Sequence, residues 1–234
     1  MTRQRSETIT CPDCGHEQRT TIWESVNADL NPELRKGILD WSFFDHTCKK
    51  CGETKKLLYP FLYHDMNNMF MVYMLLPVDD EDSEKSLKKL RDMQQAVDMT
   101  ISEDFPPVDK KFGTYKYRAV TEPNELVEKL YIFENGFSDY AIELLKRLMY
   151  LAIGGKGGAD SIEKILFQYD SGEPGLVAFM GNGEMGTIDF NQELYDDLEH
   201  MLKDYSIDEG NTYQVVDQGW AHAFDNSMRK QSGS

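Results

Sequence analysis

The sequence predicts an α+β protein: an N-terminal zinc-ribbon-like β domain with an inserted short helix, followed by a mixed helical and antiparallel-sheet domain. Three observations support this fold class. Two Cys-x-x-Cys motifs lie within the first 51 residues, strand-forming segments flank them, and helical and strand periodicities alternate after residue 115. We divide the chain into a zinc-ribbon-like domain (1–77), an acidic helix with a linker (78–114) and a C-terminal α+β domain (115–234).

The two motifs contain every cysteine of the chain. Cys11-Pro12-Asp13-Cys14 and Cys48-Lys49-Lys50-Cys51 are separated by 33 residues, and glycine follows each motif. Zinc binds four thiolates tetrahedrally at about 2.3 Å, and one Cys-x-x-Cys turn brings two thiolates to the same ion. The glycine permits a positive-φ turn that points backbone N–H groups at the sulfurs. We therefore predict one structural Zn²⁺ with four ligands: Cys11, Cys14, Cys48 and Cys51.

The remainder of residues 1–77 predicts a small sheet. Strands are expected beside the first motif and over 42–47. Asn31-Pro32 is typical of a helix start, and Leu34, Ile38 and Trp41 recur at helical spacing, which predicts a short helix between the motifs. Two apolar strands, 57–63 and 69–76, follow the second motif. The polar residues between them predict a turn that includes His64 and Asp65.

Residues 78–114 begin with the acidic run DDEDSE and contain Pro106-Pro107. The run lacks the ligand spacing of an EF-hand, and carboxylates are favourable at a helix N-terminus. We therefore interpret it as a solvated helix start, followed by a linker over 104–114.

After residue 115 the pattern predicts an α+β domain, in which the glycines and asparagine at 181–183 mark a hairpin. Charged residues of both signs on the outer faces of its first two helices predict a solvated surface. The expected strands are 115–120, 162–169, 176–180, 185–190 and 213–216, and the expected helices are 121–135, 138–148, 191–205 and 220–228.

Net charge disfavours nucleic acid and membranes as partners. The chain carries −16 overall, whereas residues 1–60 hold nine basic and nine acidic residues. Such an acidic field repels phosphates, although Lys49, Lys50, Lys55 and Lys56 form a local basic cluster. The first residues lack the apolar core of a signal peptide, and paired Cys-x-x-Cys motifs favour a reducing compartment. We expect a cytoplasmic protein.

One other chemistry competes with structural zinc. Cys-Pro-x-Cys also occurs in thioredoxin-like enzymes, but a helix follows the motif there, whereas strand formers follow it here.

His16 and His46 lie two residues from a motif, where each could donate a hydrogen bond to a sulfur or lie by chance. None of the familiar nucleophile, metalloprotease or dinucleotide motifs occurs, and no catalytic residue is assigned.

Several segments in a fixed order carry a resemblance: Ile9 to His16, Trp23, Val26-Asn27, Cys48 to Gly52, Tyr59-Pro60 and Leu62 to Asp65. With them, the sequence resembles the bacterial and archaeal CpXC family, named for its CPxC motif. The resemblance implies a zinc-ribbon-like domain with the four cysteines as ligands, and it implies no reaction.

We therefore expect a zinc-binding protein whose closed site supports a protein-interaction or regulatory module with protein partners. Two alternatives stay open: an enzyme with its active site in the C-terminal domain, and a thiol or zinc redox sensor.

Overall fold

The computed structural model describes residues 2–75, 115–153, 162–205, 207 and 213–232. Within these ranges the chain has five α-helices and three β-sheets, so the predicted α+β class is confirmed. The expected acidic helix and linker over 78–114 lie outside the described residues. The chain divides into two compact units: unit 1 comprises Met1–Val127 and Gly210–Gln214, and unit 2 comprises Glu128–Glu209 and Val215–Ser234.

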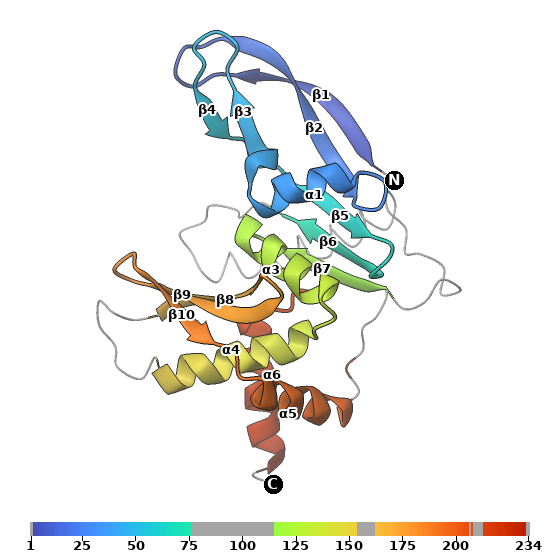
Figure 1. The fold of residues 1–234 in the computed structure, drawn as a ribbon, viewed down its shortest axis with the longest axis vertical. Helices are drawn as coiled ribbons and strands as arrows, with labels where there is room; N and C mark the ends of the chain where they lie inside the picture. Colours follow the sequence, from blue (N-terminus) through green and yellow to red (C-terminus); the bar gives the residue numbers. More distant parts are fainter. Residues whose placement is uncertain (1, 76–114, 154–161, 206, 208–212, 233–234) are drawn as a thin grey trace. The chain divides into compact units, whose positions relative to one another are not determined.

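Unit 1 is built on a five-stranded mixed sheet with the order β1-β2-β5-β6-β7 (Figure 1). Pairs β1–β2 and β5–β6 are antiparallel, whereas β2–β5 and β6–β7 are parallel. The strands are β1 (Arg3–Thr10), β2 (Glu17–Asn27), β5 (Phe61–Asp65), β6 (Phe70–Met74) and β7 (Lys116–Val120). Only the last three residues of the long β2 pair with β5, so most of the β1–β2 hairpin extends beyond the other strands.

A second hairpin, β3 (Asp45–Thr47) with β4 (Thr54–Lys56), lies beside the extended part of the first one (Figure 1). We call the two hairpins β1–β2 and β3–β4 the arm. The predicted inserted helix is α1 (Pro32–Leu39), followed by a 3₁₀ turn, η1 (Ser42–Phe44). Trp41 lies outside α1 with φ 65°, so its predicted place in the helix is wrong. Asp40 Oδ1 accepts hydrogen bonds from Ser42 N (3.0 Å) and Oγ (2.6 Å), and this interaction starts a new turn.

The core of unit 1 includes most residues of β5, β6 and β7. Every residue of β5 is buried, and β7 pairs in parallel with β6, with Lys116 opposite Phe70. The sequence pattern places this last strand in the C-terminal domain after residue 115, because a strand's own pattern does not reveal its partner. The division at residues 77 and 114 stays a prediction. One buried cluster contains Leu62, Met71, Leu75, Tyr115, Tyr117, Ala119 and Tyr213.

The predicted turn position of His64 is wrong, because β5 continues through Asp65 and the turn begins at Met66. His64 is buried, and its Nδ1 and Nε2 lie 3.3 Å from Asn27 Nδ2 and Tyr115 Oη. Burial lowers the pKa of His64 to about 4. Asp65 does take part in the turn, since its carboxylate accepts from Asn68 N and Nδ2 at 2.8 Å.

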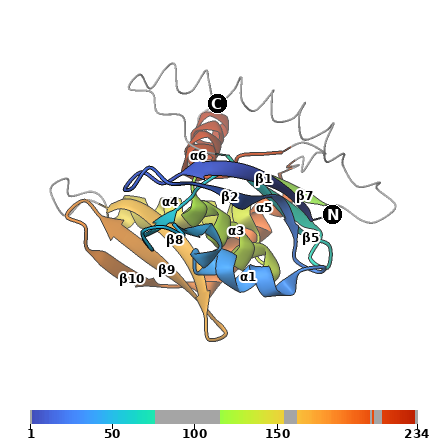
Figure 2. The ribbon, with the colours of Figure 1, turned by 90° about the horizontal axis from the view of Figure 1, so that it is seen from above.

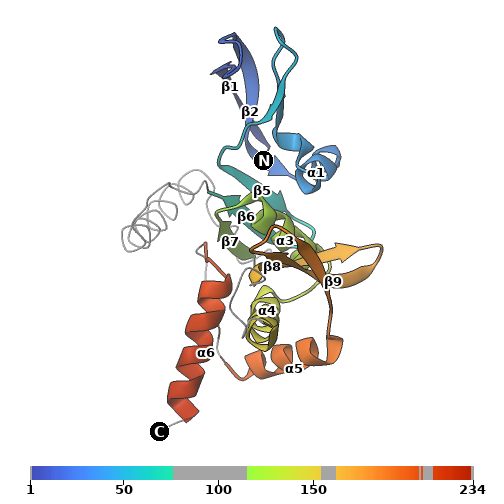
Figure 3. The same ribbon diagram turned by 90° about the vertical axis from the view of Figure 1, so that its left-hand side faces the viewer.

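Unit 2 combines a three-stranded antiparallel sheet with helices, and Figure 2 shows its strands side by side. Helix α4 contacts β8, α5 and α6, and Figure 3 shows α4 between β8 and α5. Phe137, Phe167, Phe190 and Tyr195 form an aromatic core. The elements are α4 (Asp139–Ile153), β8 (Ile162–Asp170), β9 (Glu173–Met180), β10 (Met185–Asp189), α5 (Gln192–Lys203) and α6 (Gln218–Ser232).

The boundary between the units falls within α3 (Pro123–Glu134). No helix in the described ranges is both long enough and apolar enough to span a membrane.

Candidate metal centre

Each Cys-x-x-Cys motif occupies the six-residue loop of one arm hairpin, and the two loops share one hydrogen-bond pattern. In the first loop, Cys11 N donates to His16 O (2.8 Å) and Gly15 N donates to Cys11 O (2.9 Å). In the second, Cys48 N donates to Glu53 O and Gly52 N to Cys48 O, both at 2.9 Å. The two glycines have φ of 67° and 80°, the region expected from the sequence. Two equivalent loops therefore present two thiols each.

The loops meet at the end of the arm and bring the four thiols together. All four sulfurs lie within 4.8 Å of one another, with Cys11 Sγ 3.8 Å from Cys51 Sγ and Cys14 Sγ 3.7 Å from Cys48 Sγ. Four sulfurs about 2.3 Å from one zinc ion would be about 3.8 Å apart, because that is the edge of such a tetrahedron. A disulfide needs a separation of about 2.0 Å. The four cysteines are free, and their spacing suits a metal ion.

Backbone N–H groups favour thiolates at this site. The N–H groups of Cys51 and Lys50 lower the pKa of Cys48 to about 6. The N–H of Glu53 likewise lowers the pKa of Cys51, but partial desolvation of its sulfur and the neighbouring thiols raise it to about 12, although the residue is exposed. One thiolate therefore opposes ionisation of the next, since like charges a few ångströms apart repel. A bound cation is what would allow all four to ionise together.

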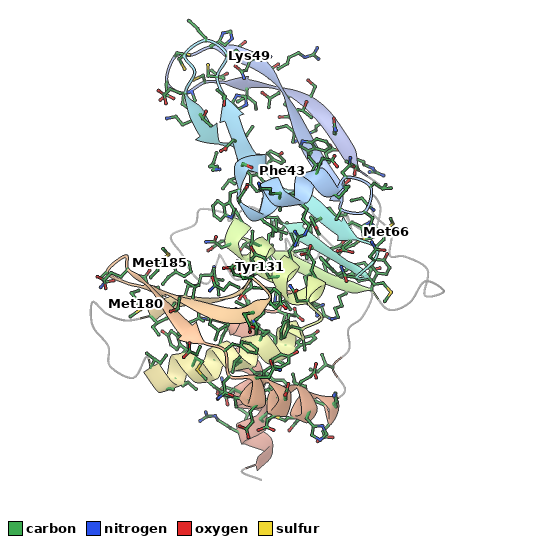
Figure 4. All side chains as sticks on the ribbon, in the orientation of Figure 1. Phe43, Lys49, Met66, Tyr131, Met180 and Met185 are labelled. Atoms are coloured by element: carbon green, nitrogen blue, oxygen red, sulfur yellow. The ribbon has the colours of Figure 1, made fainter. Side chains whose placement is uncertain are left out.

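The arm has little hydrophobic core of its own. All residues of β4 are exposed, and in β1 only Glu7 and Ile9 are half-buried. Isolated two-stranded hairpins are at best marginally stable in water. Packing resumes at the other end of the arm, where Phe43 and Phe44 contact Phe61 with ring centroids 5.4 and 5.8 Å apart. Figure 4 labels Lys49 at the thiol end and Phe43 at the packed end.

Gln18 of β2 connects the two hairpins beside the thiols. Its Oε1 accepts from Lys49 N (2.8 Å), and its Nε2 donates to Thr47 O (3.0 Å). These two bonds fix the amide orientation, so Nε2 is also the donor toward His46 Nε2 at 3.2 Å. The Nδ1 of His46, 3.2 Å from Thr20 Oγ1, then carries the ring proton. We call these bonds the Gln18 clip. No sequence signal distinguished Gln18 from any other polar strand residue.

The two histidines near the motifs have different surroundings. The imidazole of His46 contacts Gln18 and Thr20, so its hydrogen bonds support the clip. His16 contributes its backbone N–H to Cys14 and its carbonyl to Cys11. The N–H of His16 lowers the pKa of Cys14, but burial and the thiols of Cys11 and Cys48 leave that pKa raised.

Two lysines of the basic cluster have acidic partners. Lys55 Nζ on β4 lies 3.0 Å from Asp13 Oδ1 in the first loop, and Lys56 Nζ lies 2.7 Å from Asp45 Oδ1. Such pairing reduces the charge that this surface offers to phosphates.

The predicted solvated surface of the first two helices of the C-terminal domain is wrong for five charged residues. Their side chains are buried in unit 2 and form ion pairs. Charges of both signs at i, i+3 and i+4 spacing are also typical of an exposed helix face, so the sequence pattern alone did not reveal their burial. The residues are Glu128, Lys129, Asp139, Glu143 and Lys146.

The fold and the site define a mixed α+β protein whose N-terminal β region holds a four-cysteine cluster suited to metal binding. The family model described as CpXC protein matches residues 9–146, more than half of the chain. The chain belongs to this CpXC family. No curated protein and no solved structure matches this chain.

Proposed function

We propose that the chain binds one structural Zn²⁺ through Cys11, Cys14, Cys48 and Cys51, and that the ion holds the arm of a protein-interaction or regulatory module. The observation that carries this proposal is the convergence of four free thiols, all within 4.8 Å, where two hairpins with little core of their own meet. A metal bound there would supply the cross-link that apolar packing supplies elsewhere.

Zinc suits this donor set better than oxygen-seeking cations do. Tetrahedral four-thiolate sites select zinc or iron, whereas magnesium and calcium prefer oxygen ligands. Cys11 and Cys48 are 5% and 2% exposed, respectively, and four thiolates fill a tetrahedral shell without an open position. A closed site of this kind supports a structural role. Iron in the same ligands would give a coloured protein, so visible absorption, together with elemental analysis, distinguishes the two metals.

The surface chemistry supports protein partners over nucleic acid. The chain carries −16, and Lys55 and Lys56 of the basic cluster have acidic partners on the arm. Four thiolates around Zn²⁺ would add a further charge of about −2. We accordingly propose a protein partner and, from the reduced thiols, a cytoplasmic location.

A thiol redox sensor is the second candidate, because Cys51 is exposed while its sulfur lies 3.8 Å from that of Cys11. Peroxide would oxidise two thiolates to a disulfide, be reduced to water and release the ion. An enzyme centred in unit 2 has less support, since the five charged residues gathered there are at most 3% exposed.

Metal removal tests the structural role. We would treat the full chain with a chelator under reducing conditions and follow its amides by NMR. A structural ion predicts that amides of β1 to β4 lose protection from exchange while those of β8 and β9 keep it. Unchanged protection in the arm would contradict the proposal. Peroxide added to the zinc-loaded chain tests the alternative: zinc release that a reductant reverses would favour the sensor.

A further inference from the structure

Unit 2 buries five charged side chains in one group, which we call the buried charge cluster. Two lysines and three carboxyl groups take part, and each of the five residues is at most 3% exposed. Glu128 and Lys129 lie on α3, and Asp139, Glu143 and Lys146 lie on α4. Charged groups are rarely buried to this degree unless they are paired, so the pairing within the cluster determines which of its groups are ionised.

Glu143 lies between the two ammonium groups. Its Oε1 is 2.8 Å from Lys146 Nζ and 3.5 Å from Lys129 Nζ. Lys146 also contacts Glu128 Oε1 at 2.8 Å, and Lys129 contacts Asp139 Oδ2 at 3.1 Å. One oxygen of Glu143 is therefore shared by both lysines, and each lysine has a second carboxyl group as well.

The other two carboxyl groups have environments that stabilise a negative charge. Glu128 Oε1 also accepts a hydrogen bond from the backbone N–H of Phe167 on β8, at 2.6 Å. Asp139 is the first residue of α4, where the helix N-terminus favours an anion. Glu143 differs, because its Oε2 is buried and has no hydrogen-bond partner in the part of the chain that the structure describes.

The charges of the five side chains also indicate that Glu143 binds a proton. With all five groups ionised, two ammonium and three carboxylate groups leave a net charge of −1 out of contact with water. Burial raises the pKa of Glu143 from 4.5 to about 7, although Lys146 and Lys129 lower it, and Glu128 adds to the increase. A proton on Oε2 removes the unbalanced charge and leaves Oε1 free to accept from both lysines.

We propose that Glu143 is a proton-binding site of unit 2, whose carboxyl group holds a proton on Oε2 in mildly acid solution, balances the buried charge cluster in that state, and releases the proton around neutral pH. Glu143 contacts Lys146 from its own helix and Lys129 from α3, and these lysines also pair with Glu128 of α3 and Asp139 of α4. Two backbone groups also contact the cluster: the Phe167 N–H, which donates to Glu128, and the Val216 carbonyl, which accepts from Lys129 at 2.6 Å. This site is independent of the proposed zinc.

The proton links the stability of unit 2 to pH. Between about pH 4.5 and about pH 7 the folded chain holds one proton more than the unfolded chain. Stability therefore falls as pH rises through this window, and the loss is complete above it. Mild acid therefore strengthens unit 2 relative to neutral pH, whereas Glu143 adds no further pH dependence in alkali.

A carboxyl titration of the intact chain tests the proposal without any substitution. We would label glutamate side-chain carboxyl carbons with ¹³C and record NMR spectra across the pH range. The Glu143 resonance is expected to titrate with a midpoint near 7, whereas exposed glutamates titrate near their ordinary value of about 4.3. A Glu143 midpoint near that ordinary value, or the late proton assigned to Glu128 instead, would overturn the proposal.

The variant Glu143→Gln tests the link to stability, because the amide is close in shape to a protonated carboxyl. Protection factors of α4 amides should fall between about pH 5 and about pH 8 in the wild type and stay level in the variant. Glu193→Gln, at an exposed position of α5, is the matched control and should keep the wild-type slope. Equal slopes for wild type and Glu143→Gln would overturn the link, and the carboxyl titration decides the proposal if the variant does not fold.

Discussion

The arm of unit 1 and the buried charge cluster of unit 2 both concentrate groups that are negative when ionised, but they differ in what balances the charge. In the arm, four thiols converge where little apolar surface is buried, and the proposed balancing charge is a metal ion from outside the chain. In unit 2, three carboxyl groups lie within a packed core, and two lysines with one proposed proton balance them.

This difference separates the conditions to which each region responds. The stability of the arm should depend on metal supply and on thiol redox state, because a bound metal, rather than buried apolar side chains, is proposed to cross-link its hairpins. The stability of unit 2 should depend on pH and on the integrity of its ion pairs, because these charged groups are buried within its core. Three sets of substitutions and one change of pH with its own variant test this difference, in order of decreasing expected effect.

Loss of one thiol should affect unit 1 most. Cys48→Ser removes one of the four converging thiols, so we expect loss of bound zinc and unfolding of the arm. The binding free energy of a structural zinc is largely folding free energy, on the order of 10 kcal/mol in small zinc domains. Elemental analysis and amide exchange measure both effects. Lys50→Ser, an exposed change within the same loop, should retain the metal, and full metal retention by Cys48→Ser would contradict the four-thiolate site.

Removal of one buried ammonium should be the largest single change in unit 2. Lys146→Met keeps much of the side-chain volume but leaves Glu128 and Glu143 without their contacts at 2.8 Å. Breaking a buried ion pair costs about 3–5 kcal/mol, which chemical denaturation measures. Lys203→Met, at a lysine that is 67% exposed and 3.8 Å from Glu199, is the control and should change stability by under about 1 kcal/mol. A similar small loss for both variants would argue against a tightly coupled cluster.

The two units should respond to acid in opposite directions. The pKa of His64 is lowered from 6.5 to about 4, so between these values the unfolded chain binds the extra proton and unit 1 loses stability as pH falls. The loss is about 2 kcal/mol by pH 5. His64→Gln should abolish it, and His200→Gln on an exposed part of α5 should not. Exchange protection in β5 gives the readout, and a pH slope that survives His64→Gln would exclude His64 as its source.

The smallest effect is expected at the Gln18 clip. Gln18→Glu removes the donor to Thr47 O and His46 and places a carboxylate beside the thiols. Groups that orient a metal site from outside its ligand shell change metal affinity about 10–100-fold, and we expect the lower end of this range. Competition with a chromophoric chelator measures the affinity. Gln4→Glu, exposed on β1, is the control, and equal affinities for both variants would show that the clip does not support the site.

The sequence predicted that the four cysteines come together, because the signals for this are local. Each motif and its glycine lie within one six-residue loop, and the residues that form the turn are those that place the thiols. The α+β class and the three strands of unit 2 were similarly visible in short periodic segments. Such features depend on neighbours in sequence, which a single chain displays.

Features that depend on residues far apart in sequence were not predictable. Gln18 meets Lys49 across 31 positions, and Glu128 meets the Phe167 N–H across 39. Neither contact produces a recognisable pattern among residues that are neighbours in sequence. His64 was misplaced for a related reason: a polar residue before a turn indicates solvent, whereas Asn27 and Tyr115 supply buried partners in the folded chain.

The zinc site is tested most directly by the metal content of the full chain purified under reducing conditions, with its reactive thiols counted before and after chelation. We expect about one zinc per chain and thiols that react with an alkylating reagent only after the chelator removes the ion. A metal-free chain whose four thiols react at once would exclude the four-thiolate zinc site, and the arm would then need another source of stability.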